Sequence, residues 1–529
     1  MAKQSKKYKL ILCLIFLIGI GLCIFFGNKK QGYYLDEWYT VTPANGNLLG
    51  IAIDVGQWND TSPIMVQVSV QDNERFSYRR VYDTVYGIIH PPTYYMLYHT
   101  ICSFFPNQYS KWFGISLNLF IYILSIAAIY LIVSLLSDND SYATLIAVAF
   151  YAFSPAIISG VMLNRDYFAM ALFCMLYAYI ILLDYKKSRH CELKFYICTY
   201  IISLVGLFMD YMFLPIMLLL MFSYCVYLFF IQKEYLRTIL YCITELFMLI
   251  SAYILYHPII KSFTSSKRSK DVANNLKSTS FSSLSKRISV FYTNLNKGVF
   301  GGLIIIAFIA LIISIYFIIK KRKYYFTLLK TKNDSQSTQF FGIVMLSFTS
   351  LVYFLLMMKV GLLSSYATNR FVFPVYGFMI ITFSVVLVKI LKKYTQHSYI
   401  ISSAIILIML LSAFYQKQVI YLYEDEASIG EWIQNHPSVE PVVVQGDGAY
   451  DGRIQDYMKF DRVYFASTDD LNTLIDDEII SKKELLVYVD MKKDENLESI
   501  AKLFEINKNI ETSEMIYEKA GTFNIYYLH

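Results

Sequence analysis

Long apolar stretches separated by short polar breaks dominate the chain. Many of them run for about 17 to 24 residues, enough for an α-helix to cross a hydrocarbon core of about 30 Å. Of the 529 residues, 56% are hydrophobic and only 16% are charged, a composition that few soluble proteins have. The sequence therefore predicts an α-helical polytopic membrane protein.

About eleven transmembrane helices are expected from this pattern. The first follows the basic start "MAKQSKKYK" and has no small-residue cleavage site behind it, so we interpret it as a retained span rather than a signal peptide. The expected spans cover residues 10–27, 113–136, 142–162, 167–184, 195–209, 211–231, 238–258, 299–319, 340–358, 371–391 and 399–420.

The distribution of basic residues predicts the orientation. With a cytoplasmic N-terminus, the short inner segments hold 19 Lys and Arg, whereas the short outer loops hold three: Arg165, Lys359 and Arg370. Positive charge gathers on the cytoplasmic side of membrane proteins, so this orientation is favoured, with Lys29 and Lys30 as the main exceptions. We expect a plasma-membrane protein whose C-terminal domain is extracytoplasmic.

Three large segments then face outward: 28–112, 259–298 and 421–529. The last has strand-like runs "PVVVQ", "RVYFA" and "ELLVYVD" between helix-like stretches, which predicts a small α/β domain after a membrane domain of residues 1–420. The Ser- and Lys-rich segment 259–298 is expected to be a flexible loop. The "QGDGAYDG" turn is more typical of a plain strand-to-helix connection than of a phosphate site.

Other classes of protein fit the sequence poorly. Although the net charge is +7, Lys and Arg cluster beside the spans, so we expect no nucleic-acid partner. Most of the eight cysteines fall in or at apolar spans, with no CxxC pattern and no disulfide framework.

Two adjacent carboxylates, Asp36 and Glu37, stand just beyond the first span in "YYLDEWYTVTPANG". A partly desolvated carboxylate suits a general base that takes a proton from a hydroxyl. The same residues also fit an acidic first turn of a helix or an interfacial acidic pair, and spacing alone favours that structural interpretation.

His90 precedes two prolines in "IIHPPTYYMLYH". Prolines restrict the preceding residues and can open a helix, so Pro91 and Pro92 are expected to set where a helix begins and where His90 points. A histidine here can donate a hydrogen bond to a phosphate oxygen, although it can equally act as a cap or an interfacial contact.

Charged residues also lie at the outer ends of later spans. Arg165 and Arg370 offer the planar donor fork that suits phosphate, with a lipid-headgroup anchor as the alternative. Asp166 and Asp210 could pair with an arginine or cap a helix. The predicted topology gathers these residues at one membrane face with Asp36, Glu37 and His90, which suits transfer from a lipid-linked phosphate.

These motifs resemble those of the GT-C superfamily of integral-membrane glycosyltransferases. The order of a first span, an outer "DE", a loop ending "HPP-YY-L-H" and an arginine between the third and fourth spans is similar to the bacterial branch of protein O-mannosyltransferases and lipid A aminoarabinose transferases. "HPPTYYMLYHTICSFFPNQYSKWFGISLNLF" is similar to low-GC Gram-positive members, and "NRFVFPVYGFMII" is similar to the family's RYL-P-like stretch.

The resemblance implies a GT-C fold, a polyprenyl-phosphate sugar donor and inverting transfer to an extracytoplasmic acceptor, either a wall or surface polymer or a protein. It implies that Asp36 is the base, Glu37 its acidic neighbour, His90 a contact in the donor cavity, and Arg165 and Arg370 the residues that bind the donor phosphate. Some relatives use a divalent cation and others none, so no metal is assigned.

The chain departs from the family at three places. Ile88 stands where many members have Asp, and Asp166 interrupts the family's R-M-Y. Asp210-Tyr211 stands where members often have His-Tyr. Two other functions stay open: a lipid-linked saccharide transporter, which should show an internal repeat and charges in mid-span, and a catalytically silent scaffold for wall synthesis. The sequence has no evident repeat and almost no charge in mid-span, with Glu245 as the main exception.

Overall fold

The computed structural model describes residues 6–138, 140–187, 192–277, 281–331, 334–361, 366–446, 450–490, 496–520 and 523–529. The chain divides into two compact units. The membrane unit comprises the chain through Phe26, Ile89–Tyr94 and Ile115–Ile420. The sheet unit comprises Gly27–Ile88, Tyr95–Gly114 and Tyr421–His529.

The predicted polytopic architecture is confirmed. Within the described residues, eight helices are long and apolar enough to cross a membrane, or up to ten if each of two bent pairs counts as one span. The long helices are α1 (Lys6–Lys29), α6 (Lys111–Leu136), α9 (Tyr167–Lys187), α11 with its π-helical continuation (Phe213–Gln232), α12 (Tyr235–Leu255), α18 (Ser335–Val360), α19 (Phe373–Tyr394, within the candidate span Asn369–Tyr394) and α20 (Ser398–Tyr415).

The remaining three expected spans differ from straight helices. The expected span 142–162 is two helices, α7 (Ser141–Ala152) and α8 (Pro155–Met162), bent by 48°, because Pro155 has no N–H to continue the first helix. The span expected at 299–319 is α16 (Ile304–Lys320), followed after a bend of 82° by α17 (Arg322–Lys330). The stretch 195–209 is the shorter helix α10 (Leu193–Met209).

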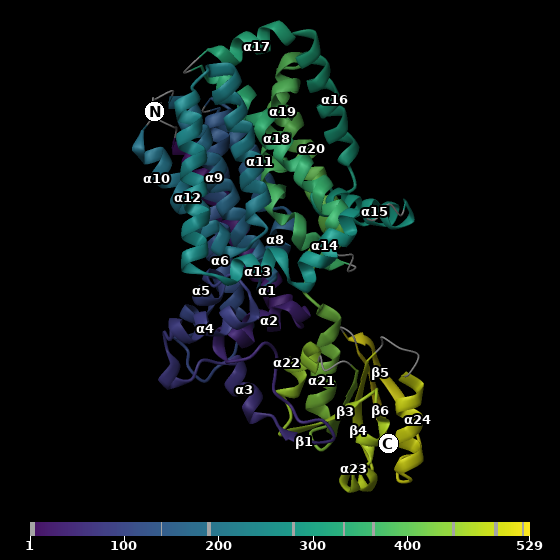
Figure 1. Cartoon of the computed structure of the whole chain (residues 1–529). Coiled ribbons are helices and arrows are strands. Elements are labelled where there is room, and N and C mark those ends of the chain that lie inside the picture. Colours follow the sequence, from purple (N-terminus) through teal and green to yellow (C-terminus); the bar gives the residue numbers. More distant parts are fainter. Residues whose placement is uncertain are drawn as a thin grey trace. The chain divides into compact units, whose positions relative to one another are not determined.

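Helix α19 is the most enclosed of the candidate spans, with 89% of its apolar window buried against 22% for α1. Gly377 permits this close packing, because a Cβ added there would lie 2.9 Å from Met175 Sδ of α9 and 3.5 Å from Ile129 Cδ1 of α6. Helix α19 lies in the helix bundle (Figure 1), and the residues that directly precede it include Arg370.

The segment 259–298, which we expected to be a loop, is helical. It contains α13 (Pro258–Thr264), α14 (Lys267–Lys277) and α15 (Phe281–Gly298). Leu284, Ile288, Phe291 and Leu295 recur at helical spacing in α15, and the Phe291 ring lies 6.1 Å from that of Phe354 in α18. The abundance of Ser and Lys hid this apolar stripe, which was the signal for a helix.

The sheet unit contains a six-stranded mixed sheet with strand order β1-β3-β2-β4-β6-β5. The three expected strands are confirmed as β2 (Glu440–Gln445), β3 (Arg462–Ser467) and β4 (Leu485–Asp490), and β2 pairs in parallel with both of the others. Strands β5 (Ser513–Ala520) and β6 (Phe523–Leu528) add an antiparallel edge. The helices of this region are α21 (Ala427–Asn435), α22 (Ile454–Tyr457), α23 (Asp477–Ser481) and α24 (Asn496–Ile506).

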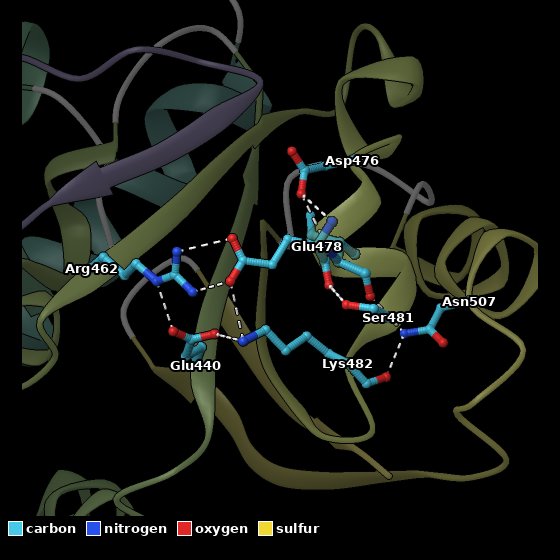
Figure 2. A network of polar contacts seen from close by, with 8 residues as sticks. Glu440, Arg462, Asp476, Glu478, Ser481, Lys482 and Asn507 are labelled. Atoms are coloured by element: carbon cyan, nitrogen blue, oxygen red, sulfur yellow. Dashed lines mark hydrogen bonds and ion pairs between the residues drawn. The ribbon is translucent and has the colours of Figure 1, made fainter.

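The sixth strand comes from the other end of the chain. Strand β1 (Gln57–Asp60) pairs antiparallel with β3 and places Trp58 opposite Tyr464. The Arg462 guanidinium lies 4.5 Å from the Trp58 ring, and Arg462 in turn donates to Glu440 and Glu478. Figure 2 shows this network, in which Lys482 also pairs with both glutamates. The first large segment thus completes the sheet of the last one.

Short helices build the rest of the first segment: α2 (Leu35–Asn45), α3 (Ser62–Val68), α4 (Tyr78–Ile88) and α5 (Thr93–Cys102). Helix α5 begins directly after Pro92, as the two prolines predict. Ile89 has a positive φ of 62°, so the chain turns sharply between α4 and His90.

Candidate functional site

Arg165 and Arg370 meet at one aromatic ring of the membrane unit. Arg165 follows α8 and Arg370 lies in a 3₁₀ helix (Tyr366–Val372) before α19, yet their guanidinium carbons lie 5.9 Å and 5.7 Å from the centroid of the Tyr167 ring. The two residues are only 3% and 5% exposed. Two arginines about 200 residues apart are thus held beside one tyrosine at the start of α9.

Asp166 contributes a negative charge at this position. Its Oδ1 lies 3.9 Å from Arg165 Nε, and its carbonyl accepts a hydrogen bond from Met170 N in the first turn of α9. Asp166 therefore both starts α9 and partly neutralises Arg165.

Asp210 ends α10 and caps the turn to α11. Its Oδ1 accepts a 2.7 Å hydrogen bond from Met212 N. It also interacts electrostatically with Tyr353 of α18, whose hydroxyl donates a 3.0 Å hydrogen bond to the Phe371 carbonyl beside Arg370. Asp210 is thus linked through Tyr353 to the Arg370 segment.

Two asparagines, Asn118 and Asn164, connect the His90 motif to the turn that carries Arg165, and the sequence did not single them out. The Tyr94 hydroxyl lies 2.9 Å from Asn118 Oδ1 and 3.1 Å from Asn164 Oδ1. Asn118 Nδ2 donates a 2.7 Å bond to the Leu163 carbonyl. The signal for Asn118 was an amide in the apolar run "GISLNLFIY", since polar groups inside spans need partners.

His90 itself lies between α4 and α5 and is partly exposed. Its carbonyl accepts a 2.7 Å hydrogen bond from the Tyr256 hydroxyl, which fixes the backbone at the two prolines. His90, Tyr94 and the arginines thus belong to one connected part of the membrane unit.

Asp36 and Glu37 lie in the sheet unit, in the first turn of α2, and have different surroundings. The Glu37 carboxylate is fully buried, accepts a 2.9 Å hydrogen bond from Tyr34 N and lies 2.9 Å from Lys30 Nζ. Asp36 is partly exposed. The helix-start arrangement is thus observed, with Glu37 as a buried anchor of the first turn.

The far end of α2 is held by a second cation. Arg80 of α4 donates a 3.0 Å bond to the Ala44 carbonyl and also binds the Gly46 carbonyl, and its Nη2 lies 3.4 Å from His99 Nδ1. Burial, aided by the Arg80 charge, lowers the pKa of His99 to about 4, so His99 is neutral at neutral pH. Both ends of α2 are therefore fixed.

Glu245, the charged residue in mid-span, has a structural environment. The Tyr177 hydroxyl donates a 3.0 Å hydrogen bond to Glu245 Oε1 and lies 2.5 Å from the Tyr241 hydroxyl. The Tyr177 hydroxyl thus satisfies one oxygen of this buried carboxylate from within the helix bundle.

The candidate residues thus form two groups, one in each unit: Asp36 and Glu37 in the sheet unit, and His90, Arg165, Asp166, Asp210 and Arg370 in the membrane unit. Across the described parts of the chain, no cluster of three or more His, Cys, Asp or Glu is arranged to hold a metal ion. The "QGDGAYDG" turn lies partly outside the described residues.

Comparison with solved structures identifies the architecture. The fold is that of ArnT. The ArnT structure from Cupriavidus metallidurans bound to undecaprenyl phosphate matches 99% of this chain and 98% of its own with a TM-score of 0.57, at 8% sequence identity. The expected GT-C likeness is therefore confirmed at the level of the fold.

Two further structures match less well. The archaeal oligosaccharyltransferase AglB from Archaeoglobus fulgidus, in complex with an inhibitory peptide and a dolichol-phosphate, has a TM-score of 0.49 at 10% identity over 98% of this chain and 74% of AglB. Apo ArnT from C. metallidurans has a TM-score of 0.45 at 8% identity over 93% of this chain and 96% of that one. No protein-family model and no curated protein matches the chain.

Proposed function

We propose that this chain is a membrane glycosyltransferase that moves a sugar from a polyprenyl-phosphate carrier to an extracytoplasmic acceptor. The observation that carries the proposal is the pair of buried arginines, Arg165 and Arg370, at the Tyr167 ring of an ArnT-like fold. The planar fork of a guanidinium group suits an anionic ligand, and a phosphate accepts the two donors of each fork.

The proposed reaction is a single displacement at the anomeric carbon. Asp36 takes the proton from the acceptor hydroxyl, and the acceptor oxygen forms a bond to the anomeric carbon from the face opposite the phosphate. The bond from that carbon to the phosphate oxygen breaks, and its electron pair leaves with the polyprenyl phosphate. Configuration is inverted, and the leaving phosphate gains negative charge.

Each candidate residue then has one role. Arg165 and Arg370 stabilise the charge on the leaving phosphate, and Asp166 sets how much of the Arg165 charge remains for it. His90 contacts the donor, and Asp210 supports the Arg370 segment through Tyr353. Glu37 holds α2 through Lys30, so that Asp36 alone acts as the base.

The proposed orientation places the N-terminus in the cytoplasm and the sheet unit outside. The two lysines that disagree with this orientation have carboxylate partners in their own unit. Lys30 is buried against Glu37, and Lys29 lies 3.4 Å from Glu424 Oε2. The proposal rests on the larger number of basic residues in the segments placed inside.

The experiment is donor turnover by the purified protein in detergent. A panel of polyprenyl-phosphate sugars is supplied with cell-wall polymer or protein acceptors, and released polyprenyl phosphate is measured. Arg165→Ala and Arg370→Ala are each expected to lower kcat/KM for the donor by roughly 10²- to 10³-fold. Arg79→Ala, at an arginine whose side chain is 94% exposed, is the control and should have no effect.

If the Arg165 and Arg370 variants turned over the donor as fast as the Arg79 variant, neither arginine would have the proposed phosphate-binding role. Failure of every donor in the panel, with an intact fold, would favour a non-catalytic role for the chain.

A further inference from the structure

Asp451 of the sheet unit binds the segment that carries the proposed catalytic base. It lies after β2 in a 3₁₀ turn (Tyr450–Arg453) and is 7% exposed. Its Oδ1 accepts a 2.8 Å hydrogen bond from Ile51 N, and its carboxylate accepts a hydrogen bond from the Tyr39 hydroxyl. One side chain thus joins α2 and the chain that follows it to the C-terminal sheet.

The backbone at Gly50 is shaped for this contact. Gly50 has a φ of +86°, and a Cβ added there would lie 2.5 Å from Asp451 Oδ2 and 2.6 Å from Oδ1. The carboxylate therefore sits directly against the backbone. A side chain at residue 50 would both strain the φ angle and displace the carboxylate.

Asp36 and Tyr39 lie three residues apart in α2 and so share one face of the helix. The Asp36 charge acts on the Tyr39 hydroxyl, which is the group that binds Asp451. Lys30 joins Glu37 to the Tyr421 carbonyl with bonds of 2.9 Å each. Tyr421 and Asp451 of the C-terminal segment are thus linked to α2, the first through Lys30 and the second through Tyr39.

We propose that Asp451 is a positioning residue for Asp36, acting through Tyr39 and the Gly50–Ile51 backbone. The C-terminal domain is then part of the catalytic machinery, because it fixes the helix that carries the base. This inference rests on the proposed function in assigning Asp36 as the base.

The ionisation of Asp451 supplies a distinctive readout. Burial raises its pKa to about 6, against the opposing effect of the Ile51 and Tyr39 hydrogen bonds. The titratable groups that face it are Tyr39 of α2 and Tyr457 of α22. Below pH 6 the carboxyl is neutral, as an asparagine would be, so an Asn variant should differ from the parent only at higher pH.

The experiment combines two measurements on the full chain in detergent. The first is hydrogen–deuterium exchange of the amides of residues 35–51, which needs no activity. The second is donor turnover from pH 5 to pH 8. The variants are Asp451→Asn, Tyr39→Phe and Gly50→Ala. The controls are Asp461→Asn, at an exposed carboxylate of the same domain, and Gly56→Ala, whose φ of +85° gives the same strain with no atom nearer than 3.9 Å to the added Cβ.

At pH 7.5 the three variants should exchange faster over residues 35–51 than their controls. They should also lose kcat by roughly 10- to 100-fold with little change in donor KM, since a misplaced base costs rate rather than binding. The loss in Asp451→Asn should disappear at pH 5.

The proposal would be overturned if the three variants had the same exchange and the same kcat as their controls. It would also be overturned if the loss of kcat in Asp451→Asn were the same at pH 5 and pH 7.5. Full activity of Asp36→Asn would refute the proposed base instead, while exchange would still decide whether Asp451 holds α2.

Discussion

Lys30 and Glu37 form an ion pair in which both side chains are buried, with Nζ 2.9 Å from Oε1. Removing one partner of such a pair leaves an uncompensated buried charge. Lys30→Ala is therefore expected to lower the free energy of unfolding by about 3–5 kcal/mol. The measurement is thermal or denaturant unfolding of the purified protein in detergent.

The neighbouring pair Lys29–Glu424 provides the control, because its side chains are 42% and 46% exposed. Lys29→Ala should cost at most about 1 kcal/mol. Equal losses in the two variants would show that the Lys30 pair is not protected from solvent in the way the structure describes.

Tyr167 is expected to hold the two arginines through its ring. Tyr167→Leu removes the ring face from both guanidinium groups and should raise the KM for the donor by roughly 5- to 30-fold, equivalent to about 1–2 kcal/mol. Tyr167→Phe keeps the ring and should leave KM near that of the parent. Matching KM values for the Leu and Phe variants would exclude the ring as the organiser of the arginines.

The raised pKa of Asp451 predicts a stability change of known sign. An Asp whose pKa is higher in the folded than in the unfolded chain binds more protons when folded, so stability falls as pH rises from the unfolded value near 4 through about 6. The free energy of unfolding of the parent should therefore fall by up to about 3 kcal/mol between pH 4 and pH 7.5 through this group, and Asp451→Asn should lack this contribution to the pH dependence. Asp461→Asn serves as the control, and a pH dependence in Asp451→Asn equal to that of the parent would contradict the assignment.

The proposed orientation predicts which side of the membrane each polar segment occupies. In intact cells, a membrane-impermeant thiol reagent should label a cysteine introduced at exposed Lys508 but not one at exposed Lys323, which should react only after permeabilisation. The unmodified protein gives the background from its own cysteines. The reverse labelling pattern would invert the topology and remove the outer location of the proposed reaction.

The sequence predicted the spans of the membrane part well because long apolar stretches are local signals. Each of the eleven expected spans has a counterpart, and Pro155 could have indicated the bend in the third. The location of β1 could not be predicted, since its partner β3 is about 400 residues away and the four-residue strand has no apolar alternation. Pairing over such a separation is decided by the tertiary structure alone.

The sequence indicated which residues belong to the candidate site, but not the surroundings of each residue in the fold. The two arginines were identified as charges at span ends, but nothing local indicated that Tyr167 lies beside both. Spacing alone did not distinguish the environments of Asp36 and Glu37, and the fold shows that Glu37 is the buried partner of Lys30 whereas Asp36 is partly exposed. Asp451 was missed because its role depends on contacts with residues 39, 50 and 51, far away in sequence.

The role of Asp36 is tested most directly by the rate at which Asp36→Asn releases polyprenyl phosphate from a polyprenyl-phosphate sugar that the parent protein consumes. Because a general base typically contributes about 10²- to 10⁴-fold, we expect a loss of that size, with Asp83→Asn, at a carboxylate that is 65% exposed, as active as the parent. An Asp36→Asn protein that releases the carrier as fast as the parent would contradict the proposed base.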